Sequence, residues 1–328
     1  MTDTEQNRNW LSYRPDIKVL DCTIRDGGLI NQHYFEDGFV KAVYDCNVAA
    51  GVDYMELGYK GDKSIYIPTE HGPWKHCDEE TLRRIVGDNP SDLKLAVMAD
   101  ADRSDYKNDI LPKKDSVIDL IRVACYIHQV PLALEMVKDA ADKGYEVMLQ
   151  LMAISTVQEG ELIAALEAAA TSEATGVYIV DSFGALYSEQ IRELTRRFKS
   201  ILDDAGKEVG IHAHNNQQLA FANTIEAIVC GANRVDATLA GLGRGAGNCP
   251  MELLLGFLHN PKYKLRPVLA CTQEVLFPLS RQLDWGYSIP YALTGQLNQH
   301  PRMAIACRAS EAPDDYVAFY DRLMDEYS

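Results

Sequence analysis

The sequence predicts an α/β fold, a (β/α)₈ TIM barrel with a C-terminal helical extension. Short apolar, β-branched runs alternate with helical patterns, and eight such units fit between residues 16 and 262. This alternation indicates a parallel sheet, and eight units over roughly 240 residues fit a closed barrel better than an open sheet. Polar residues also follow the predicted strands at their C-terminal ends, where active sites lie in such barrels. We therefore divide the chain into an N-terminal arm (1–15), a barrel (16–262) and a helical extension (263–328).

The predicted strands are short runs rich in Val, Ile and Leu. They cover residues 17–22, 54–58, 93–98, 117–123, 146–151, 177–180, 209–213 and 234–237. Helical spacing of apolar residues predicts helices over residues 35–50, 78–86, 131–143, 157–170, 188–203, 220–230 and 250–258. The polar segment between the third and fourth strands predicts only a stunted helix. The long aromatic loop over residues 59–75 is typical of a binding loop.

The first predicted strand leads directly into Arg25, Asp26 and two glycines. Glycine lets the backbone turn sharply and approach a ligand closely. A cation and a carboxylate are therefore presented together where a strand gives way to a loop. On its own, this pattern is more typical of a surface ion pair before a tight turn.

A second pattern, His212-x-His214, lies at the end of the seventh predicted strand. Residues two apart on a strand point to the same side, so both imidazoles can face one point. Asp26 can add a carboxylate oxygen, which completes a plausible set of ligands for a divalent metal. The alternative is a pair of strand histidines with ordinary hydrogen-bond partners.

Other polar residues at strand ends carry weaker predictions. Glu56 ends the second strand, where a buried carboxylate needs a partner, and we expect a salt bridge to Arg25. Asp181-Ser182 ends the sixth strand and is either part of the site or a helix-capping turn. The glycine-rich run 241–248 resembles a dinucleotide fingerprint, but too few strand–helix units follow it for such a fold. We expect it to direct Asn248 toward the barrel mouth.

The composition excludes several classes of function. The formal net charge is −16, so nucleic acid and anionic membranes would repel the protein. The N-terminal segment has no apolar core of a signal peptide, and no apolar run approaches ~18 residues, so no membrane span is expected. The eight cysteines are scattered without a C-x-x-C pair. Reduced thiols and a cytoplasmic location are the expectation.

Three sequence motifs together resemble the DRE-TIM metallolyase superfamily, whose HMGL-like members include hydroxymethylglutaryl-CoA lyase, isopropylmalate synthase and 4-hydroxy-2-oxovalerate aldolase. The motifs are DCTIRDGG at residues 21–28, HAHNN at 212–216 and GLGRGAGN at 241–248. The last loop lacks the cysteine-bearing insertion of the hydroxymethylglutaryl-CoA lyases. Together with the stretch 286–300, it makes the chain most similar to the 4-hydroxy-2-oxovalerate aldolase branch.

The resemblance implies roles for individual residues. It implies Asp26, His212 and His214 as metal ligands, with Asn248 as an additional ligand. It implies Arg25 as the cation beside the enolate oxygen and a catalytic tyrosine in the C-terminal region, which we assign to Tyr287. The branch carries its base histidine where this chain has Leu29, and His33 is the candidate substitute. The remaining polar residues near the expected barrel mouth are assigned to substrate binding: Glu56, Ser182, Tyr291 and His300.

The resemblance implies a divalent metal, Mn²⁺ or Mg²⁺ before Co²⁺ or Zn²⁺, and an aldolase that makes or breaks a C–C bond through a pyruvate-type enolate. The substrates would be a small 2-oxo acid and an aldehyde, with no nucleic acid or membrane as partner. A homodimer or a partner dehydrogenase is the expected assembly. One alternative is a Claisen-type synthase that joins an acyl-CoA to a 2-oxo acid. Another is a barrel that binds metal and ligand without catalysis, which is motivated by Leu29. Separately, Tyr287, Tyr291 and His300 could equally serve to pack the extension on the barrel.

Overall fold

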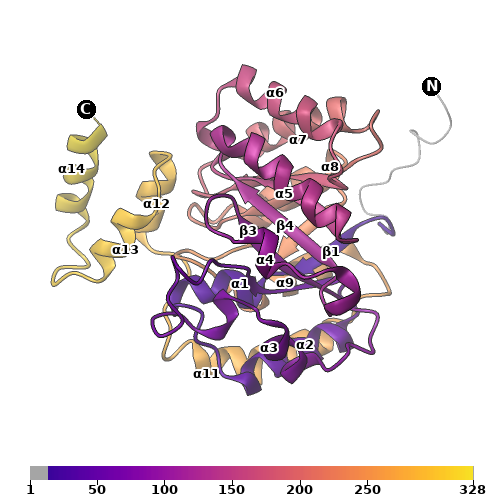
Figure 1. The fold of residues 1–328 in the computed structure, drawn as a ribbon. Coiled ribbons are helices and arrows are strands. Elements are labelled where there is room, and N and C mark those ends of the chain that lie inside the picture. The colour runs from indigo at the N-terminus through magenta and orange to yellow at the C-terminus, as the bar shows by residue number, and fades with distance from the viewer. Residues whose placement is uncertain (1–13, 328) are drawn as a thin grey trace.

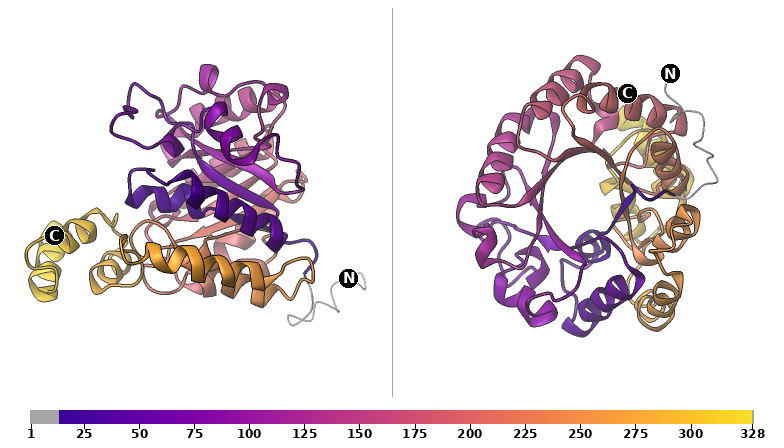
Figure 2. Two further views of the ribbon diagram at one scale, coloured as in Figure 1. Left: turned by 90° about the horizontal axis from the view of Figure 1, so that it is seen from below. Right: turned by 90° about the vertical axis from the view of Figure 1, so that its right-hand side faces the viewer.

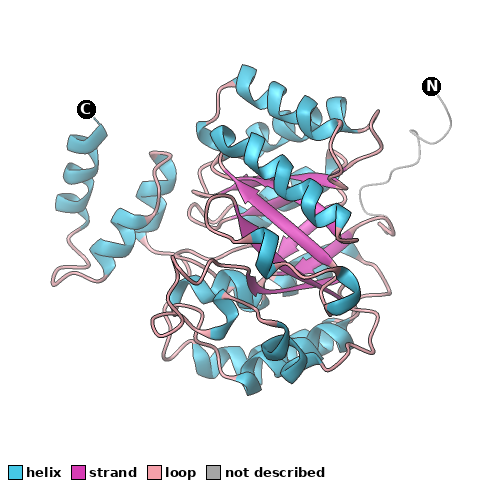
Figure 3. Ribbon diagram, viewed as in Figure 1, coloured by secondary structure: helices cyan, strands magenta, loops and turns pink. Residues whose placement is uncertain are grey.

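The computed structural model describes residues 14–327, and within them eight parallel strands form a closed barrel. Each strand pairs with the next, and β8 pairs with β1 to close the sheet. Figure 3 shows the strands enclosed by helices. The predicted fold class is therefore confirmed. The strands are β1 (Lys18–Asp21), β2 (Tyr54–Tyr59), β3 (Lys94–Asp100), β4 (Leu120–Cys125), β5 (Glu146–Leu151), β6 (Gly176–Asp181), β7 (Glu208–Ala213) and β8 (Arg234–Ala237).

The helices surround the strands, as the view along the barrel shows (Figure 2, right). The helix between β3 and β4 is short, as expected from its polar segment. Gly51, with φ +74°, ends α2 in the left-handed conformation that favours glycine. The barrel helices are α1 (Thr23–Gly27), α2 (Asp37–Ala50), α3 (Glu79–Val86), α4 (Tyr106–Asp109), α5 (Val130–Asp142), α6 (Glu159–Ala170), α7 (Ser188–Leu202), α8 (Ala220–Val229) and α9 (Met251–Leu258).

Two local expectations were wrong. Arg25 and Asp26 do not lie in a glycine turn, because residues 23–27 form the short helix α1, and both Gly27 and Gly28 have ordinary right-handed helical backbone. Their small size matters instead, since a Cβ on Gly28 would lie 2.2 Å from Nδ1 of His33. Strand β4 also begins three residues later than predicted, at Leu120, because the apolar residues Val117 and Ile118 belong to the preceding buried loop.

Apolar side chains fill most of the barrel, and charged ones close its N-terminal end. Leu20, Leu120, Met148 and Tyr178 pack in an inner cluster, while the outward faces of the strands pack against the helices. At the N-terminal ends of the strands, Arg234 forms ion pairs with Glu146 and Glu208. The opposite, C-terminal end is where the predicted site residues lie.

The C-terminal segment has two parts. Helix α10 (Leu265–Cys271) continues through a π-helical turn (Thr272–Leu276) into α11 (Phe277–Leu279), and Val268 and Leu276 join the barrel core. Helices α12 (Ile289–Gln296), α13 (Arg302–Arg308) and α14 (Tyr316–Tyr327) form a cluster at one side of the barrel (Figure 1). The division at residue 262 stays a prediction, and the predicted arm lies outside the described residues except for residues 14 and 15.

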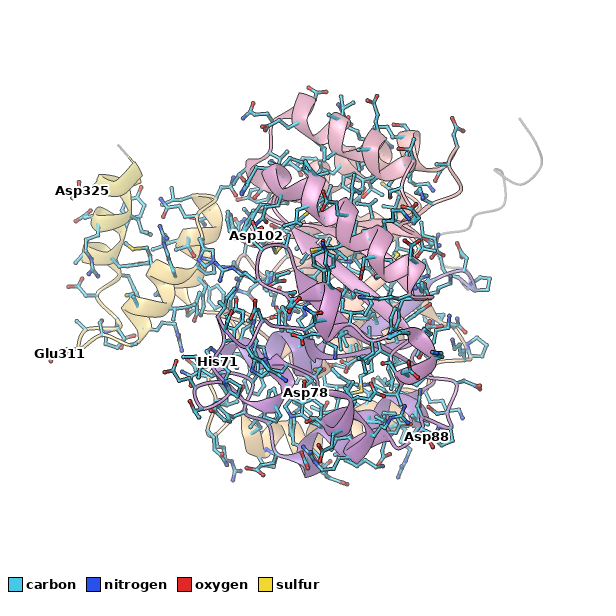
Figure 4. The ribbon with its side chains drawn as sticks, viewed as in Figure 1. His71, Asp78, Asp88, Asp102, Glu311 and Asp325 are labelled. Atoms are coloured by element: carbon cyan, nitrogen blue, oxygen red, sulfur yellow. The ribbon has the colours of Figure 1, made fainter. Side chains whose placement is uncertain are left out.

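Acidic side chains lie on the outside of both parts, for example Asp78, Asp88 and Asp102 on the barrel and Glu311 on the segment between α13 and α14 (Figure 4). This distribution agrees with the net charge of −16. Among residues 14–327, no helix combines the length and apolar character that a membrane crossing requires.

Candidate metal and substrate site

Helix α1 places Arg25 and Asp26 at the C-terminal mouth of the barrel, immediately after β1. Asp26 is completely buried and Arg25 is 4% exposed. The backbone N–H of Arg244, in the glycine-rich loop after β8, donates to Oδ1 of Asp26 at 2.8 Å. This bond turns the other carboxylate oxygen, Oδ2, toward β7.

His212 at the end of β7 and His214 just after it meet Asp26 as predicted. Nε2 of His212 lies 3.4 Å from Oδ2 of Asp26, and Nε2 of His214 lies 3.9 Å from the same oxygen. The ligand atoms of the three residues all lie within 4.8 Å of one another. The rings are edge to face, with centroids 5.1 Å apart, so both nitrogens approach one point from different directions.

The hydrogen bonding of His212 fixes which nitrogen faces that point. Its Nδ1 lies 2.9 Å from Oδ2 of Asp236. Burial raises the pKa of Asp236, but the charge of Arg122 and the bond from His212 outweigh burial and hold that pKa below its usual value. The ionised carboxylate can only accept, so Nδ1 carries the hydrogen, and Nε2 is the nitrogen that would bind a metal beside Asp26.

These residues fit a divalent cation. Nε2 of His212 and Oδ1 of Asn248 are buried and have no hydrogen-bond partner among the described residues. Burial lowers the pKa of His214 well below its usual value, so this ring is neutral. Burial alone would raise the pKa of Asp26, but Arg25 and both histidines lower it well below its ordinary range. A neutral imidazole and an ionised carboxylate are the forms that bind metal.

A closed ring of ion pairs, completed by His212, joins the site to the barrel interior. Nη1 of Arg25 lies 2.5 Å from Asp26 and its Nε 2.7 Å from Glu56, which confirms the predicted salt bridge. Glu56 also contacts Nη1 of Arg122 at 2.8 Å, and Nη2 of Arg122 lies 2.5 Å from Asp236. Asp236 contacts Nδ1 of His212, and Nε2 of His212 lies beside Asp26, which closes the ring. Such a network stays favourable in a dry interior only because each charge has opposite partners.

Sequence reasoning missed Arg122, Asp236 and Arg244. Arg122 and Asp236 interrupt otherwise apolar strands, in Leu-Ile-Arg-Val-Ala and Val-Asp-Ala. A charge inside a fully buried strand requires a partner, and this was the available signal. Arg244 lies within a motif that we had recognised, but the prediction rested on its glycines and on Asn248.

Replacing Asp236 with asparagine should lower the affinity for Mn²⁺ about 10- to 100-fold, the usual effect of losing a residue that orients a metal-binding histidine. The matched control is Glu208→Gln, which removes a carboxylate from a buried arginine at the opposite end of the barrel. Electron paramagnetic resonance titration with Mn²⁺ measures both. Equal affinities in Asp236→Asn and the unmodified protein would show that Asp236 does not orient His212.

A pocket opens above these residues at the C-terminal mouth. Four of the predicted metal-site and catalytic residues line it, together with Ser182, whose Oγ accepts a hydrogen bond from the Ala153 N–H at 2.8 Å. Leu29, which stands where the sequence resemblance led us to expect a base, also lines it. The lining residues are Arg25, Asp26, Leu29, Tyr59, Met98, Ala124, Gln150, Met152, Val180, Ser182, His212, His214 and Arg244.

The other predicted site residues do not line this pocket in the structure. Glu56 is completely buried and holds Arg25 from behind. His33 is buried and packs edge to face with Tyr59, and burial lowers its pKa to about 2. Tyr291 packs against Gly245, while Tyr287 is 54% exposed. His300 lies edge to face with Phe183, and burial lowers its pKa to about 4.

The roles of these five residues therefore stay predictions. Asn248 lies closer to the centre: its backbone pairs with that of His214, and its amide is held by the Leu242 carbonyl at 3.3 Å. Its Oδ1 is buried and has no hydrogen-bond partner among the described residues, so Asn248 remains the predicted additional oxygen ligand.

Comparison with known proteins agrees with this geometry. The sequence profile of the HMGL-like family matches residues 16–273. An oxaloacetate decarboxylase of Mycobacterium tuberculosis is 34% identical over 246 residues, covering 74% of this chain and 69% of that protein. A 4-hydroxy-2-oxovalerate aldolase of Bacillus cereus is 30% identical over 254 residues, covering 77% and 72%.

A crystal structure of the N-terminal domain of a putative aldolase from Bacteroides vulgatus superposes with a TM-score of 0.79 at 28% identity, over 88% of this chain and 96% of that chain. The residues matched by the family profile include all three motifs and all eight strands. The resemblance inferred from the motifs is confirmed: the chain belongs to the HMGL-like family and is a carbon–carbon lyase of that family.

Proposed function

We propose that the protein breaks a C–C bond beside the carbonyl of a small 2-oxo acid, with a pyruvate-type enolate as the immediate product, and that aldol cleavage of a 4-hydroxy-2-oxo acid is its reaction. The observation that carries this proposal is the convergence of Asp26, His212 and His214 beside Arg25 at the barrel mouth. We propose Asn248 as a further oxygen ligand. A bound divalent cation, Mn²⁺ or Mg²⁺ before Co²⁺ or Zn²⁺, would polarise the carbonyl and stabilise negative charge on its oxygen.

Arg25 supplies the second stabilising charge. Its Nη1 and Nε are fixed by Asp26 and Glu56, while Nη2 makes no hydrogen bond with a described residue. The guanidinium therefore lines the pocket in a fixed orientation with one nitrogen free for a substrate oxygen. A donor that is oriented before the reaction stabilises developing charge without reorganisation. We assign the enolate oxygen to this nitrogen.

Aldol cleavage also requires a base for the proton of the 4-hydroxyl group. His33 and Tyr287 remain our candidates, and either would have to reach the pocket in the substrate complex. Ser182 lines the pocket, and Tyr291 and His300 pack near the glycine-rich loop, so we retain all three as substrate-binding candidates. The carbonyl product would be an aldehyde, as the names of the aldolase relatives suggest.

A second candidate is decarboxylation of a 3-carboxy-2-oxo acid, favoured by Leu29. In this reaction the bond to the carboxylate breaks, its electrons form the enolate, and CO₂ leaves without removal of a proton. No base is needed for that step, and Leu29 occupies the position where an aldolase base would line the pocket. The relative named oxaloacetate decarboxylase is consistent with this chemistry. Release of CO₂ from oxaloacetate, compared with release of acetaldehyde from 4-hydroxy-2-oxovalerate, separates the two reactions.

Removal of divalent metal should abolish cleavage of either acid. Protein treated with a chelator and desalted is expected to lose at least about 99% of its activity and to regain it with Mn²⁺ or Mg²⁺, because the enolate charge loses its main stabilisation. Lactate dehydrogenase coupled to pyruvate release measures the rate. Unchanged turnover after chelation would refute the proposed function.

Hydrogen exchange of the methyl group of pyruvate in heavy water tests the remaining alternatives. Metal-dependent exchange requires enolate formation, and its presence excludes a barrel without catalysis. Thiol release from acetyl-CoA with a 2-oxo acid would instead indicate the Claisen-type synthase.

We further propose a cytoplasmic location, supported by all eight cysteines being free thiols in the described residues. A homodimer or a partner dehydrogenase that consumes the aldehyde remains our proposed assembly. Size-exclusion chromatography with light scattering tests the first of these.

A further inference from the structure

The pocket contains two arginines, and their charges are balanced very differently. Arg25 has two carboxylate partners, Asp26 and Glu56. Arg244 has none: among the described side chains, no carboxylate oxygen lies within ion-pair distance of its guanidinium. Its side chain is held only by the backbone carbonyl of Ser182, 2.7 Å from Nη2. Its Nε is buried and has no hydrogen-bond partner among the described residues.

The surroundings of Arg244 do not neutralise it by other means. Among the groups whose pKa it affects are His214 on the metal side, and Tyr291 and His300 on the side of the extension. Its charge lowers the pKa of all three, and none of them is a carboxylate. In a protein with 48 acidic and 32 basic residues, a partly buried arginine without an acidic partner is unusual. Burying an unpaired charge is costly, so an anion at this position would stabilise it.

Charge balance in the site indicates where that anion comes from. The connected ring contains three carboxylates (Asp26, Glu56 and Asp236), two arginines (Arg25 and Arg122) and His212, which has to be neutral to bind a metal. Counted in that metal-binding form, the ring carries a charge of −1. A divalent cation changes this to +1, and the carboxylate of one 2-oxo acid would balance it. Asp181 is separate from the ring, because its carboxylate accepts from the backbone N–H groups of Ala185 and Leu186. The charge of Arg244 is then still unbalanced.

We propose that Arg244 binds a second anionic group of the substrate, so that the preferred substrates are 2-oxo acids with a carboxylate or similar anion at the end away from the metal. This inference rests on the proposed function, because it assumes that the 2-oxo acid group occupies the Asp26–His212–His214 centre. Arg244 fits the role because its backbone N–H is fixed by Asp26 while its side chain lines the pocket. The guanidinium would bind a carboxylate through charge-assisted hydrogen bonds.

The bound anion is not a carboxylate that leaves as CO₂. Decarboxylation moves the electrons of the breaking bond away from the carboxylate, and pairing with Arg244 would stabilise the charge that has to be lost. The second anion therefore belongs to the part of the substrate that does not form the enolate. In an aldol reaction, that part is the aldehyde.

The test compares two acids of equal chain length that carry no 4-hydroxyl and so are not cleaved. 2-Oxoglutarate ends in a carboxylate, and 2-oxovalerate ends in a methyl group. Calorimetric titration of the Mn²⁺-loaded protein should show 2-oxoglutarate binding at least about tenfold more tightly. In Arg244→Gln this preference should fall to within about twofold, and Arg244→Lys should retain part of it because the charge remains. Arg103→Gln, which removes an exposed arginine that does not line the pocket, is the control and should keep the full preference.

Equal affinity for the two acids in the unmodified protein, or an unchanged preference in Arg244→Gln, would overturn the inference. Hydrogen exchange of pyruvate separates this failure from a failure of the proposed function. Metal-dependent exchange without a preference for 2-oxoglutarate would leave the enolate chemistry intact and reject the role of Arg244. Absence of exchange together with absence of binding of both acids would reject both proposals.

Discussion

Asp26→Ala and His212→Ala are each expected to reduce metal-dependent C–C cleavage by at least about 10³-fold. Each variant removes one of the three donors that converge within 4.8 Å, which weakens binding of the cation that would stabilise the enolate charge. The measurement is kcat with saturating Mn²⁺, accompanied by a Mn²⁺ binding titration. Binding and turnover should fall together in both variants.

Both variants should remain folded, because the ring of charges tolerates the loss of either member. Without Asp26, Arg25 still pairs with Glu56, and without His212, Asp236 still pairs with Arg122. We expect a loss of about 1–2 kcal/mol in the free energy of unfolding, measured by denaturant titration without metal. His128→Ala, which removes a histidine from the segment before α5, is the control and should keep full activity. Full turnover in Asp26→Ala or His212→Ala would show that the ligand assignment is wrong.

The sequence was sufficient to predict the fold and the centre of the site, because both depend on short-range patterns. Short apolar runs and helical spacing defined eight units, and the rule that parallel strands end at one face placed Asp26 beside His212 and His214. The order and direction of the strands are sufficient to predict that these three residues lie close together. Their convergence is accordingly the prediction that the structure confirms most directly.

The residues that hold the centre in place depend on register and depth, which the sequence does not show. Arg122 and Asp236 are 114 residues apart and meet across the barrel interior, because both side chains point inward at the same level. The order of residue types along the chain does not show how deep in the barrel each side chain lies. The position of His33 illustrates the same limit: it follows the first motif closely, yet it packs edge to face with Tyr59 and does not line the pocket.

Arg25→Lys is expected to lower kcat by about 10²- to 10³-fold, although the positive charge is kept. The guanidinium contacts Asp26 through Nη1 and Glu56 through Nε, and it still has Nη2 free for the substrate. A single ammonium group cannot occupy these three positions, so it would pair with one or both buried carboxylates and leave the enolate oxygen without its donor.

The matched control for Arg25→Lys is Arg234→Lys. Arg234 is also buried and also pairs with two carboxylates, Glu146 and Glu208, but at the opposite end of the barrel. The control should lose stability while keeping kcat close to that of the unmodified protein. Mn²⁺ affinity should change by less than about tenfold in Arg25→Lys, because Asp26, His212 and His214 are all retained. If Arg25→Lys kept the kcat of the unmodified protein, the charge alone would be sufficient, and the oriented nitrogen would have no part in stabilising the enolate.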